Sequence, residues 1–530
     1  MSNGYASSNL TSGFIDLATY DEQEKYTYGG SESIAYFVRE VRKSTWFTQV
    51  PVVLSKSSGQ PGFGQQWSAQ ISRAGDYLLQ TWLRVQLPAV TSAFTNLSTG
   101  LTTITSATAP TINVLRWTRN LMHNLIRECS ITFNDLVAAR FDNFHLDFWA
   151  AFTVPAGKRN GYNVMIGNIP ALTNPVSTNH SLLASGTAQS LPAAVLNLPL
   201  PFFFSRDSGI ALPTAALPYN EMRINFSFRN WNELLIKDTY TSAVIPATPL
   251  PVVYSNAIGG AALTSTTGGL WTSSAATTAD IAGGVMTDIG NNTQVWANYA
   301  IVSNEERKKM ACAPRDILIE QVQTAPPQTI AAPAAGQTSY PSFDIRFSHA
   351  VKVLFWSAQN QASAALSNYT TDSQYPLGPW QSGNVAVIPA QNAMFGMIDF
   401  TAGSDPIDNT SLIYENTQRL QNMGSDYFSL VNPWYSAPVI PLETGYHSYS
   451  YSLDFFNIDP QGSTNYGKLT NVSIRPQTSV AASGNKVLPL PTNTAGGSVT
   501  ATTGNYNFVT TCVNNNIIRI SGGALGFPVL

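Results

Sequence analysis

Residues 76–87 read DYLLQTWLRVQL, and their character changes at every second position. One face carries the larger or more apolar side chains, namely Tyr77, Leu79, Thr81, Leu83, Val85 and Leu87. The other face carries Gln80, Arg84 and Gln86. Because successive side chains of a β-strand point to opposite faces of a sheet, this alternation predicts a strand with one buried face.

The same period of two recurs along the chain, whereas helical patterns are few. Strands are predicted at 221–229, 296–302, 317–323, 343–356, 449–455, 470–475, 505–513 and 517–521. Short helices are predicted at 143–152 and 231–235, and a third begins at Ser303, where Ser303 and Glu306 form a capping box, and ends before Pro314. The pattern is typical of an all-β protein with small helical decorations.

The organisation predicted for these strands is two β-sandwiches in tandem. With 530 residues the chain is too long for one core, because single cores stop growing at roughly 250–300 residues. The helix that begins at Ser303 falls near the middle, with strand-rich regions on either side. Long uncharged loops are predicted between strands, at 91–109, 169–194, 239–294 and 492–504.

The composition excludes several classes of protein. Charged residues make up 11% of the chain, against about 25% in ordinary globular proteins. Hydrophobic residues reach 44%, so the chain does not have the composition of a disordered protein, and a helix-rich protein would carry more Glu, Lys and Arg. The net charge is −3, whereas a protein that binds nucleic acid directly usually carries a basic stripe on its surface. Direct binding of nucleic acid is therefore not expected.

The three cysteines, the N-terminal residues and the apolar segments indicate in which cellular compartment the chain matures. Cys129, Cys312 and Cys512 are widely separated, which excludes a disulfide scaffold and a CxxC-type zinc site and fits a reducing compartment. The N-terminal residues have no pattern of a signal peptide. The chain contains no apolar run of 18 residues, so no transmembrane helix is expected.

Two segments imitate catalytic motifs. Residues 462–469, GSTNYGKL, lack the hydroxyl residue that ends a P-loop, because Leu469 stands there, and an alternating strand follows instead of a helix. Asp207, Ser208 and Gly209 resemble the triplet of aspartic proteases, but no second such triplet exists to supply the other carboxylate. Both segments are predicted to be turns or loops.

The histidines and cysteines form no recognisable site. Cys129 falls in a plausible buried strand, so a nucleophile–base pair with His123 is not expected. His145 and Asp147 lie in an aromatic segment, where packing explains them better than metal binding. The sequence therefore predicts no catalytic, cofactor-binding or metal-binding residues, although calcium sites built from loop carbonyls would leave no contiguous motif.

Several blocks of sequence resemble a known family. These are 13–22 (GFIDLATYDE), 117–124 (WTRNLMHN), 158–168 (KRNGYNVMIGN), 198–209 (LPLPFFFSRDSG), 217–225 (LPYNEMRIN), 346–352 (RFSHAVK), 445–450 (GYHSYS), 462–471 (GSTNYGKLTN) and 526–528 (GFP). In this order they resemble the major capsid proteins of iridoviruses and related large icosahedral double-stranded DNA viruses. The segments 239–294 and 483–504 look longer than in typical members, which suggests a neighbouring virus family.

The resemblance implies a double jelly-roll fold and a structural function without catalysis. It implies homotrimeric capsomers of pseudo-hexagonal outline, which tile an icosahedral virion shell around an internal membrane. The expected domains are an arm (1–28), a first jelly-roll (29–302) with a long loop insertion (239–294), a helix and linker (303–316) and a second jelly-roll (317–530). The expected partners are further copies of the chain, minor capsid and penton proteins and internal membrane-associated viral proteins, with assembly in the host cytoplasm.

One alternative stays open from the sequence. Jelly-rolls also occur in lectins, so a carbohydrate-binding or adhesive β-sandwich, such as a fibre or spike, is the competing interpretation. The low charge favours the capsid, since neutral surfaces avoid like-charge repulsion between many identical copies.

Overall fold

The computed structural model describes residues 4–95, 111–175, 188–242, 269–334, 336–361, 364–371, 405–483 and 505–527. The chain divides into two compact units, Met1–Trp46 and Phe47–Leu530. The first unit contains α1 (Gly4–Ala18) and α2 (Glu22–Thr27), and α2 begins with a capping box between Asp21 and Glu24. Its division at Trp46 lies beyond the arm expected at residues 1–28, whose boundary stays a prediction.

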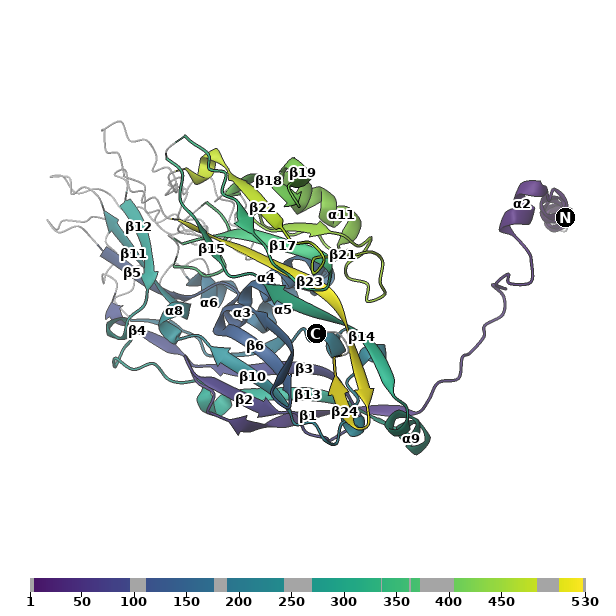
Figure 1. Cartoon of the computed structure of the whole chain (residues 1–530), viewed down its shortest axis with the longest axis horizontal. Helices are drawn as coiled ribbons and strands as arrows, with labels where there is room; N and C mark the ends of the chain where they lie inside the picture. The colour runs from purple at the N-terminus through teal and green to yellow at the C-terminus, as the bar shows by residue number, and fades with distance from the viewer. Residues whose placement is uncertain are drawn as a thin grey trace. The chain divides into compact units, whose positions relative to one another are not determined.

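The first half of the second unit forms two facing sheets (Figure 1). One sheet has the order β1-β13-β3-β9, and its strands are β1 (Phe47–Ser58), β13 (Gln294–Val302), β3 (Tyr77–Leu87) and β9 (Ala194–Pro199). The other has the order β2-β10-β6-β7, with β2 (Gln66–Gln70), β10 (Met222–Phe228), β6 (Ile126–Phe133) and β7 (Leu136–Asp142). All the pairs are antiparallel, and β1 also pairs with β2. Numbered along the chain, the two orders are 1-8-3-6 and 2-7-4-5, which is the jelly-roll arrangement.

The second half repeats this order of strands. One sheet is β14-β23-β17-β20, from β14 (Arg315–Thr324), β23 (Tyr506–Ser521), β17 (Ala350–Asn360) and β20 (His447–Ser450). The other is β16-β22-β18-β19, from β16 (Phe343–Asp344), β22 (Val472–Thr478), β18 (Ile407–Tyr414) and β19 (Thr417–Gly424). These are again 1-8-3-6 and 2-7-4-5, so the predicted all-β, double jelly-roll fold is confirmed.

Shorter elements extend the sheets and connect them. Three short strands join the second jelly-roll, β15 (Gln328–Ile330), β21 (Thr464–Asn465) and β24 (Ala524–Gly526). In the described residues of the first half, two separate small sheets, β4-β8 and β12-β11-β5, are formed by β4 (Val90–Thr95), β5 (Thr111–Trp117), β8 (Ala188–Leu191), β11 (Leu235–Ser242) and β12 (Gly269–Ala275). Among the described residues, the α-helices of the second unit are α3 (Leu121–Leu125), α4 (Asn143–Thr153), α5 (Ala156–Ile166), α6 (Pro170–Thr173), α8 (Trp231–Leu234), α9 (Asn304–Cys312) and α11 (Asn432–Ser436). The 3₁₀ turns are η2 (Phe203–Ser205), η3 (Ser208–Ile210), η4 (Thr214–Ala216), η5 (Thr278–Asp280), η6 (Gly290–Asn292) and η9 (Val480–Ala482), and η8 (Tyr427–Val431) is a π-helix.

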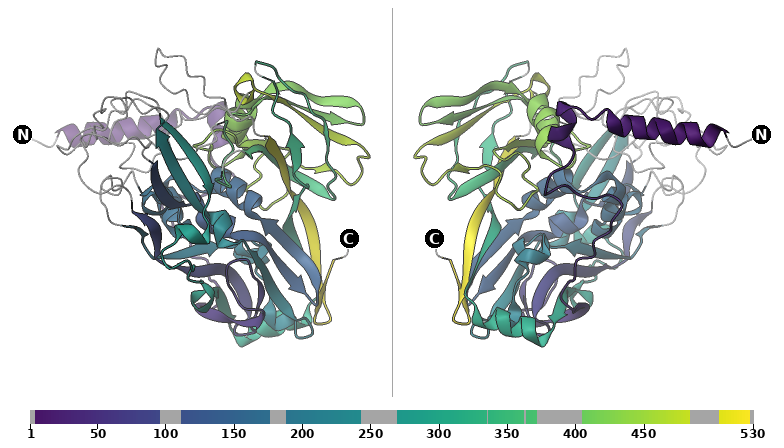
Figure 2. Two further views of the ribbon diagram at one scale, coloured as in Figure 1. Left: turned by 90° about the vertical axis from the view of Figure 1, so that its left-hand side faces the viewer. Right: turned by 90° about the vertical axis from the view of Figure 1, so that its right-hand side faces the viewer.

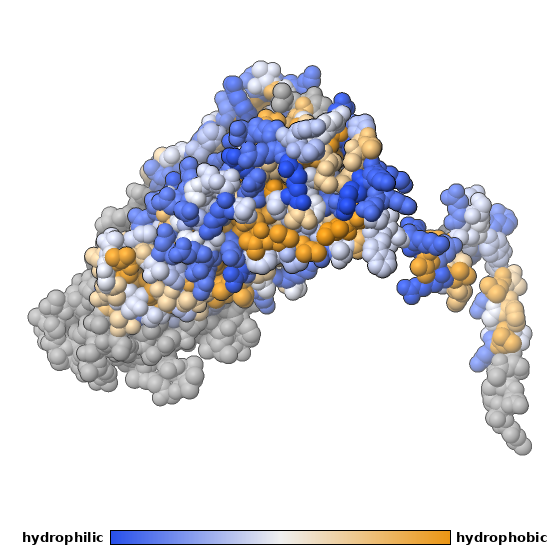
Figure 3. Space-filling model, turned by 90° about the horizontal axis from the view of Figure 1, so that it is seen from below, coloured by the Kyte–Doolittle hydropathy of each residue, from blue (hydrophilic) through white to orange (hydrophobic). Residues whose placement is uncertain are grey.

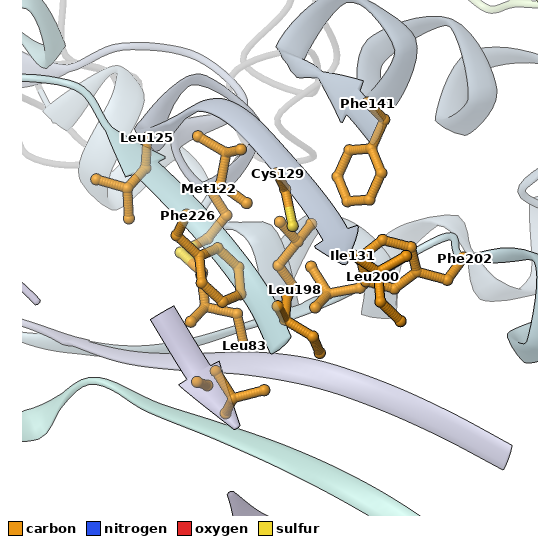
Figure 4. Packing of buried hydrophobic residues seen from close by; sticks show 14 of the residues in the cluster. Leu83, Met122, Leu125, Cys129, Ile131, Phe141, Leu198, Leu200, Phe202 and Phe226 are labelled. Carbon is orange, nitrogen blue, oxygen red and sulfur yellow. The ribbon is translucent and has the colours of Figure 1, made fainter. Parts of the chain in front are cut away.

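The core of the first jelly-roll lies between its two sheets. Trp67 of β2 stacks on Phe226 of β10, with ring centroids 4.7 Å apart. Figure 4 shows Leu83, Cys129 and Leu198 among the side chains that meet in this core. The buried positions of β10 alternate strictly, because a strand between core and outside buries every second residue.

Two predicted strands have different limits in the structure. Residues 343–356 are not one strand, because β16 ends at Asp344 and β17 begins at Ala350 in the other sheet. His349 has a left-handed φ of 64°, which allows the chain to turn between the sheets. Conversely, 505–513 and 517–521 belong to the single strand β23, whose middle residues Asn514–Asn516 pair with β14.

The capping box predicted for Ser303 does not form. Ser303 is the N-cap of α9, but its side chain makes no cap hydrogen bond. The helix is held by a tertiary contact instead, since Arg307 Nε donates to Asp76 Oδ1 at 2.7 Å, just before β3. The predicted hydrogen bonds of the capping box are therefore absent, and the ion pair between Arg307 and Asp76 holds the start of the helix instead.

The segments predicted to be long loops contain regular structure. Within 239–294 lie the end of β11, the paired strand β12, η5 and η6, so the expectation of one uninterrupted loop is wrong. Strand pairing to β11 explains the difference, because it satisfies backbone groups that a loop would leave to water. The segment 169–194 contains α6 and β8, and 91–109 begins with β4. Residues 243–268 and 492–504 lie outside the described residues.

Candidate functional site

The motifs that imitate catalytic sites are turns. Gly462 has a φ of 120°, and β21 and a turn follow it before β22. No helix N-terminus follows the lysine of residues 462–469, so the geometry of a P-loop is not formed there. Asp207 precedes the short turn η3, and the Gly209 carbonyl accepts a hydrogen bond from Arg315 at 3.1 Å.

The histidines and cysteine considered in the sequence are buried in separate surroundings. The pKa of the Cys129 thiol is raised well above its usual value by burial, which keeps it protonated. His145 packs between Phe141 and Trp149, and burial lowers its pKa to about 3, so the ring stays neutral. His145 does not pair with Asp147; His123 does.

A buried polar cluster around Asp147 joins the two jelly-rolls. From the first, His123 Nδ1 lies 2.8 Å and Asn120 Nδ2 3.2 Å from Asp147 Oδ1. From the second, Ser367 Oγ and Tyr369 Oη donate to Oδ2 at 2.9 and 2.8 Å. The other ring nitrogen of His123, Nε2, lies 2.6 Å from Tyr162 Oη, so the imidazole bridges Asp147 and Tyr162. Six polar side chains, Asp147 included, are thereby connected by hydrogen bonds.

Aromatic side chains of α4 form the apolar part of the same junction. Phe148 and Phe152 stack on Phe355 of β17, with ring centroids 5.8 and 5.3 Å apart. Tyr369, Tyr446 and Phe455 of the second jelly-roll complete the cluster. Phe355 points away from the core of its own jelly-roll, whereas its neighbours Leu354 and Trp356 point into it. Helix α4 therefore covers the outer face of the sheet β14-β23-β17-β20.

Ion pairs also cross the junction. Arg206 of the first jelly-roll pairs with Glu320 of β14, and its guanidinium lies 4.9 Å from the ring centroid of Trp149. Glu320 also accepts from Lys352 Nζ at 2.5 Å, and burial, with Arg206 nearby, lowers the pKa of Lys352 to about 8. Arg119 and Glu443 form a further pair between the halves. Buried charges of this kind are tolerated only when paired, so they fix the relative orientation of the two jelly-rolls.

This arrangement is suited to rigidity rather than to a reaction. Its ionisable groups are matched to partners and shielded by aromatic rings. Among the residues that the structure describes, no group of three or more His, Cys, Asp or Glu side chains is placed to hold a metal ion. No helix in the described part of the chain is long and apolar enough to cross a membrane.

Sequence reasoning missed this junction, although two signals for it exist. Residues 143–152 are rich in aromatic side chains, but the sequence does not identify their partner. In β17, residues 351–356 are buried on both faces and, apart from Lys352, form an apolar run. Such runs indicate a strand that is covered on both sides, in contrast to the alternation of 76–87.

Comparisons with known proteins agree with the fold and with one another. The family described as large eukaryotic DNA virus major capsid protein matches residues 306–526, and the family described as major capsid protein N-terminus matches residues 35–267. The chain is 57% identical to the major capsid protein of Costelytra zealandica iridescent virus, over 99% of both chains. It is 55% identical to that of Invertebrate iridescent virus 6, again over 99% of both, and 43% identical to that of Lymphocystis disease virus 1.

The coverages do not compare the lengths of individual segments, so the extra length expected at 239–294 and 483–504 stays a prediction. Among solved structures, the Faustovirus major capsid protein aligns with a TM-score of 0.62 at 12% identity, over 92% of this chain and 93% of that chain. The PBCV-1 virus capsid model aligns with a TM-score of 0.61 at 19% identity, over 94% and 100%. These two likenesses concern the fold.

Proposed function

The chain belongs to the major capsid proteins of large eukaryotic DNA viruses, and from this premise we propose that three copies form a capsomer of pseudo-hexagonal outline. Its function is structural, and it is a component of the virion capsid rather than an enzyme. In the proposal, many such trimers tile an icosahedral shell around an internal membrane.

The observation that carries the proposal is the repeated strand order. Both jelly-rolls have the orders 1-8-3-6 and 2-7-4-5, and a buried junction holds them together. Three chains of this kind supply six similar lobes, and a ring of six similar lobes has the outline that packs into a hexagonal layer.

Light scattering coupled to size-exclusion chromatography tests the trimer. We expect a species of three times the chain mass of 57.2 kDa, and negative-stain images with six lobes. A stable monomer or dimer at micromolar concentration, or an unbranched fibre, would contradict the proposal. Glycan binding by a monomer would favour the adhesive alternative.

The N-terminal arm is proposed to face the interior, towards minor capsid, penton and membrane-associated proteins. Support comes from its surface, since Leu10, Phe14 and Leu17 of α1 are all exposed, and an isolated helix of this length is only marginally stable in water. Residues 239–294 are proposed to face outward. An electron cryo-microscopy map of the particle that placed either segment on the opposite side would refute that assignment.

The remaining proposals concern location and nucleic acid. We place assembly in the host cytoplasm, which immunogold labelling of infected cells would test. The net charge of −3 supports a shell without direct contact to the genome. Retention of the purified trimer on a DNA column at physiological salt would contradict this.

A further inference from the structure

Helix α1 of the first unit has an apolar side and a polar side. Leu10, Phe14 and Leu17 follow one another at intervals of four and three residues, so their side chains share one side of the helix. These side chains are 65%, 64% and 76% exposed. The opposite side carries Ser12 and Asp16. Figure 2 shows α1 and the shorter α2 as purple ribbons.

The first unit leaves the apolar side of α1 open. Between residues 9 and 46 every residue is exposed except Glu24, which is half-buried. In Figure 3 the first unit is at the right, and hydrophobic residues lie openly on its surface. Apolar surface that its own unit does not cover usually marks a site of contact with a partner.

The charge of the arm restricts what this partner can be. Residues 1–28 contain the acidic residues Asp16, Asp21, Glu22 and Glu24 but only one basic residue, Lys25, which gives a net charge of −3. Helix α1 contains neither Lys nor Arg. Helices that bind anionic membranes carry Lys and Arg on their polar side, and nucleic acid also requires basic residues. The surface that α1 contacts is therefore electrically neutral.

Three tyrosines that follow α1 favour a lipid surface over a groove in a protein. Tyr20, Tyr26 and Tyr28 are 51%, 92% and 69% exposed, and Tyr20 Oη donates to the Tyr28 carbonyl oxygen at 3.1 Å. Tyrosine is enriched where a membrane meets water, because its ring is apolar and its hydroxyl is polar. A groove that bound α1 would cover the helix alone, whereas the surface of a bilayer accommodates the helix and the rings together.

The segment that connects α1 and α2 to the first jelly-roll provides reach. Residues 28–46 contain neither helix nor strand, and Gly29 and Gly30 have φ of 95° and 102°. A fully extended segment of this length spans up to about 60 Å. Such a tether allows α1 to lie flat on a surface that the jelly-rolls do not touch.

We propose that α1 is a membrane-binding helix, which lies in the surface of a neutral, loosely packed bilayer with Leu10, Phe14 and Leu17 among the acyl chains. Without basic residues, the binding depends on buried apolar area alone, so it requires gaps between the lipid headgroups. The position of this contact in the virion, at the internal membrane, rests on the proposed inward arm. A trimer would present three such helices, whose individually weak contacts reinforce one another.

Flotation of the purified full chain with lipid vesicles tests the inference. The probes are small, strongly curved vesicles of dioleoylphosphatidylcholine, large vesicles of the same lipid, and small vesicles that also contain dioleoylphosphatidylserine. We expect the chain to float with the small neutral vesicles and less with the large ones, because curvature opens gaps between headgroups. Phosphatidylserine should not strengthen the binding, since the arm is acidic.

Two substitutions with the same charge on opposite sides of α1 form a matched pair. Phe14→Glu should lower the vesicle-bound partition by about tenfold or more, because it removes a buried ring and adds a charge. Ser12→Glu places the same side chain on the polar side and should bind like the wild-type chain. Phe14→Ala keeps a strong helix former and should also weaken binding, which separates loss of the ring from loss of the helix.

The outcomes separate this inference from the proposed function. A wild-type chain that does not float with small neutral vesicles would overturn the inference and leave a protein as the partner of α1. Binding that requires phosphatidylserine, or equal effects of Phe14→Glu and Ser12→Glu, would overturn it as well. Light scattering of the same samples tests the trimer independently, and a chain that is not trimeric would refute the proposed function whether or not it binds vesicles.

Discussion

The hydroxyl of Tyr369 donates a hydrogen bond to Oδ2 of Asp147, 2.8 Å away, and this bond connects the second jelly-roll to the first. The two residues are separated by 222 positions in the sequence. Asp147 accepts from four side chains in total, two from each jelly-roll. If the jelly-rolls separated, Ser367 and Tyr369 would lose this acceptor, whereas His123 and Asn120 belong to the same jelly-roll as Asp147.

Replacing this carboxylate should strongly destabilise the chain. Asp147→Ala leaves four buried donors without an acceptor, and we expect a loss of about 3 kcal/mol in the free energy of unfolding. Urea denaturation, monitored by tryptophan fluorescence, measures this change in the free energy of unfolding. Asp316→Ala is the control, because Asp316 is half-exposed and pairs with Arg519 on the surface, so its midpoint should stay close to the wild-type value. Equal midpoints for the two variants would contradict the role given to Asp147.

The aromatic part of the junction should contribute as much as a core residue does. Phe148 is fully buried and stacks on Phe355, so Phe148→Ala should cost about 3–5 kcal/mol through lost burial and the cavity left behind. Tyr340→Ala removes an exposed ring and should change stability by less than about 0.5 kcal/mol. Thermal unfolding of the Phe148→Ala and Tyr340→Ala variants measures both effects. A small effect of Phe148→Ala would mean that α4 is only loosely attached to β17.

Stability should fall in mild acid because of His145. Burial lowers its pKa to about 3 in the folded chain, from an ordinary value near 6.5, so below pH 6.5 protons bind the unfolded chain preferentially. This contribution is present in full above pH 6.5 and is lost progressively as the pH falls towards 3. In His145→Phe, which keeps an aromatic ring between Phe141 and Trp149, the midpoint should fall less between pH 7 and pH 4.5. Parallel curves for the two proteins would show that His145 does not contribute.

Two glycines should respond in opposite ways to alanine. Gly445 has a φ of 97°, and an added Cβ would lie 2.2 Å from the Tyr369 carbonyl oxygen, so Gly445→Ala should cost about 3 kcal/mol. Gly161 lies inside α5 with open space around the position of its Cβ. Gly161→Ala should stabilise the chain by about 0.5–1 kcal/mol through helix propensity. Differential scanning fluorimetry of both variants checks the two signs together.

The strands were the part of the fold that local sequence could predict. The alternation of 76–87 corresponds to β3, and 221–229 and 317–323 fall on β10 and β14. Prediction was wrong where a distant contact overruled the local pattern. His349 turns the chain inside 343–356, Arg307 binds Asp76 beside the unformed cap at Ser303, and β12 pairs with β11 inside a predicted loop.

The sequence by itself determined the class of this protein. Period-two alternation indicates sheets with one buried face. The composition and low charge exclude disordered, helix-rich and nucleic-acid-binding proteins. The ordered blocks of residues indicate the capsid family, and the comparisons show it. It also indicated that the motifs at 462–469 and 207–209 are turns.

Only the tertiary structure decided which strands pair and how the two halves meet. The orders 1-8-3-6 and 2-7-4-5 join strands that are far apart in the chain, and the partners of Asp147 and Phe148 come from the opposite half. Local patterns report whether a side chain is buried, since burial sets the period of hydrophobicity. Local sequence patterns do not identify the element that buries a side chain. An aromatic residue packed on the outside of a sheet and one inside a core show the same local hydrophobic pattern. The position of Trp434 on an open face and of Phe148 under a covered one follows from packing alone.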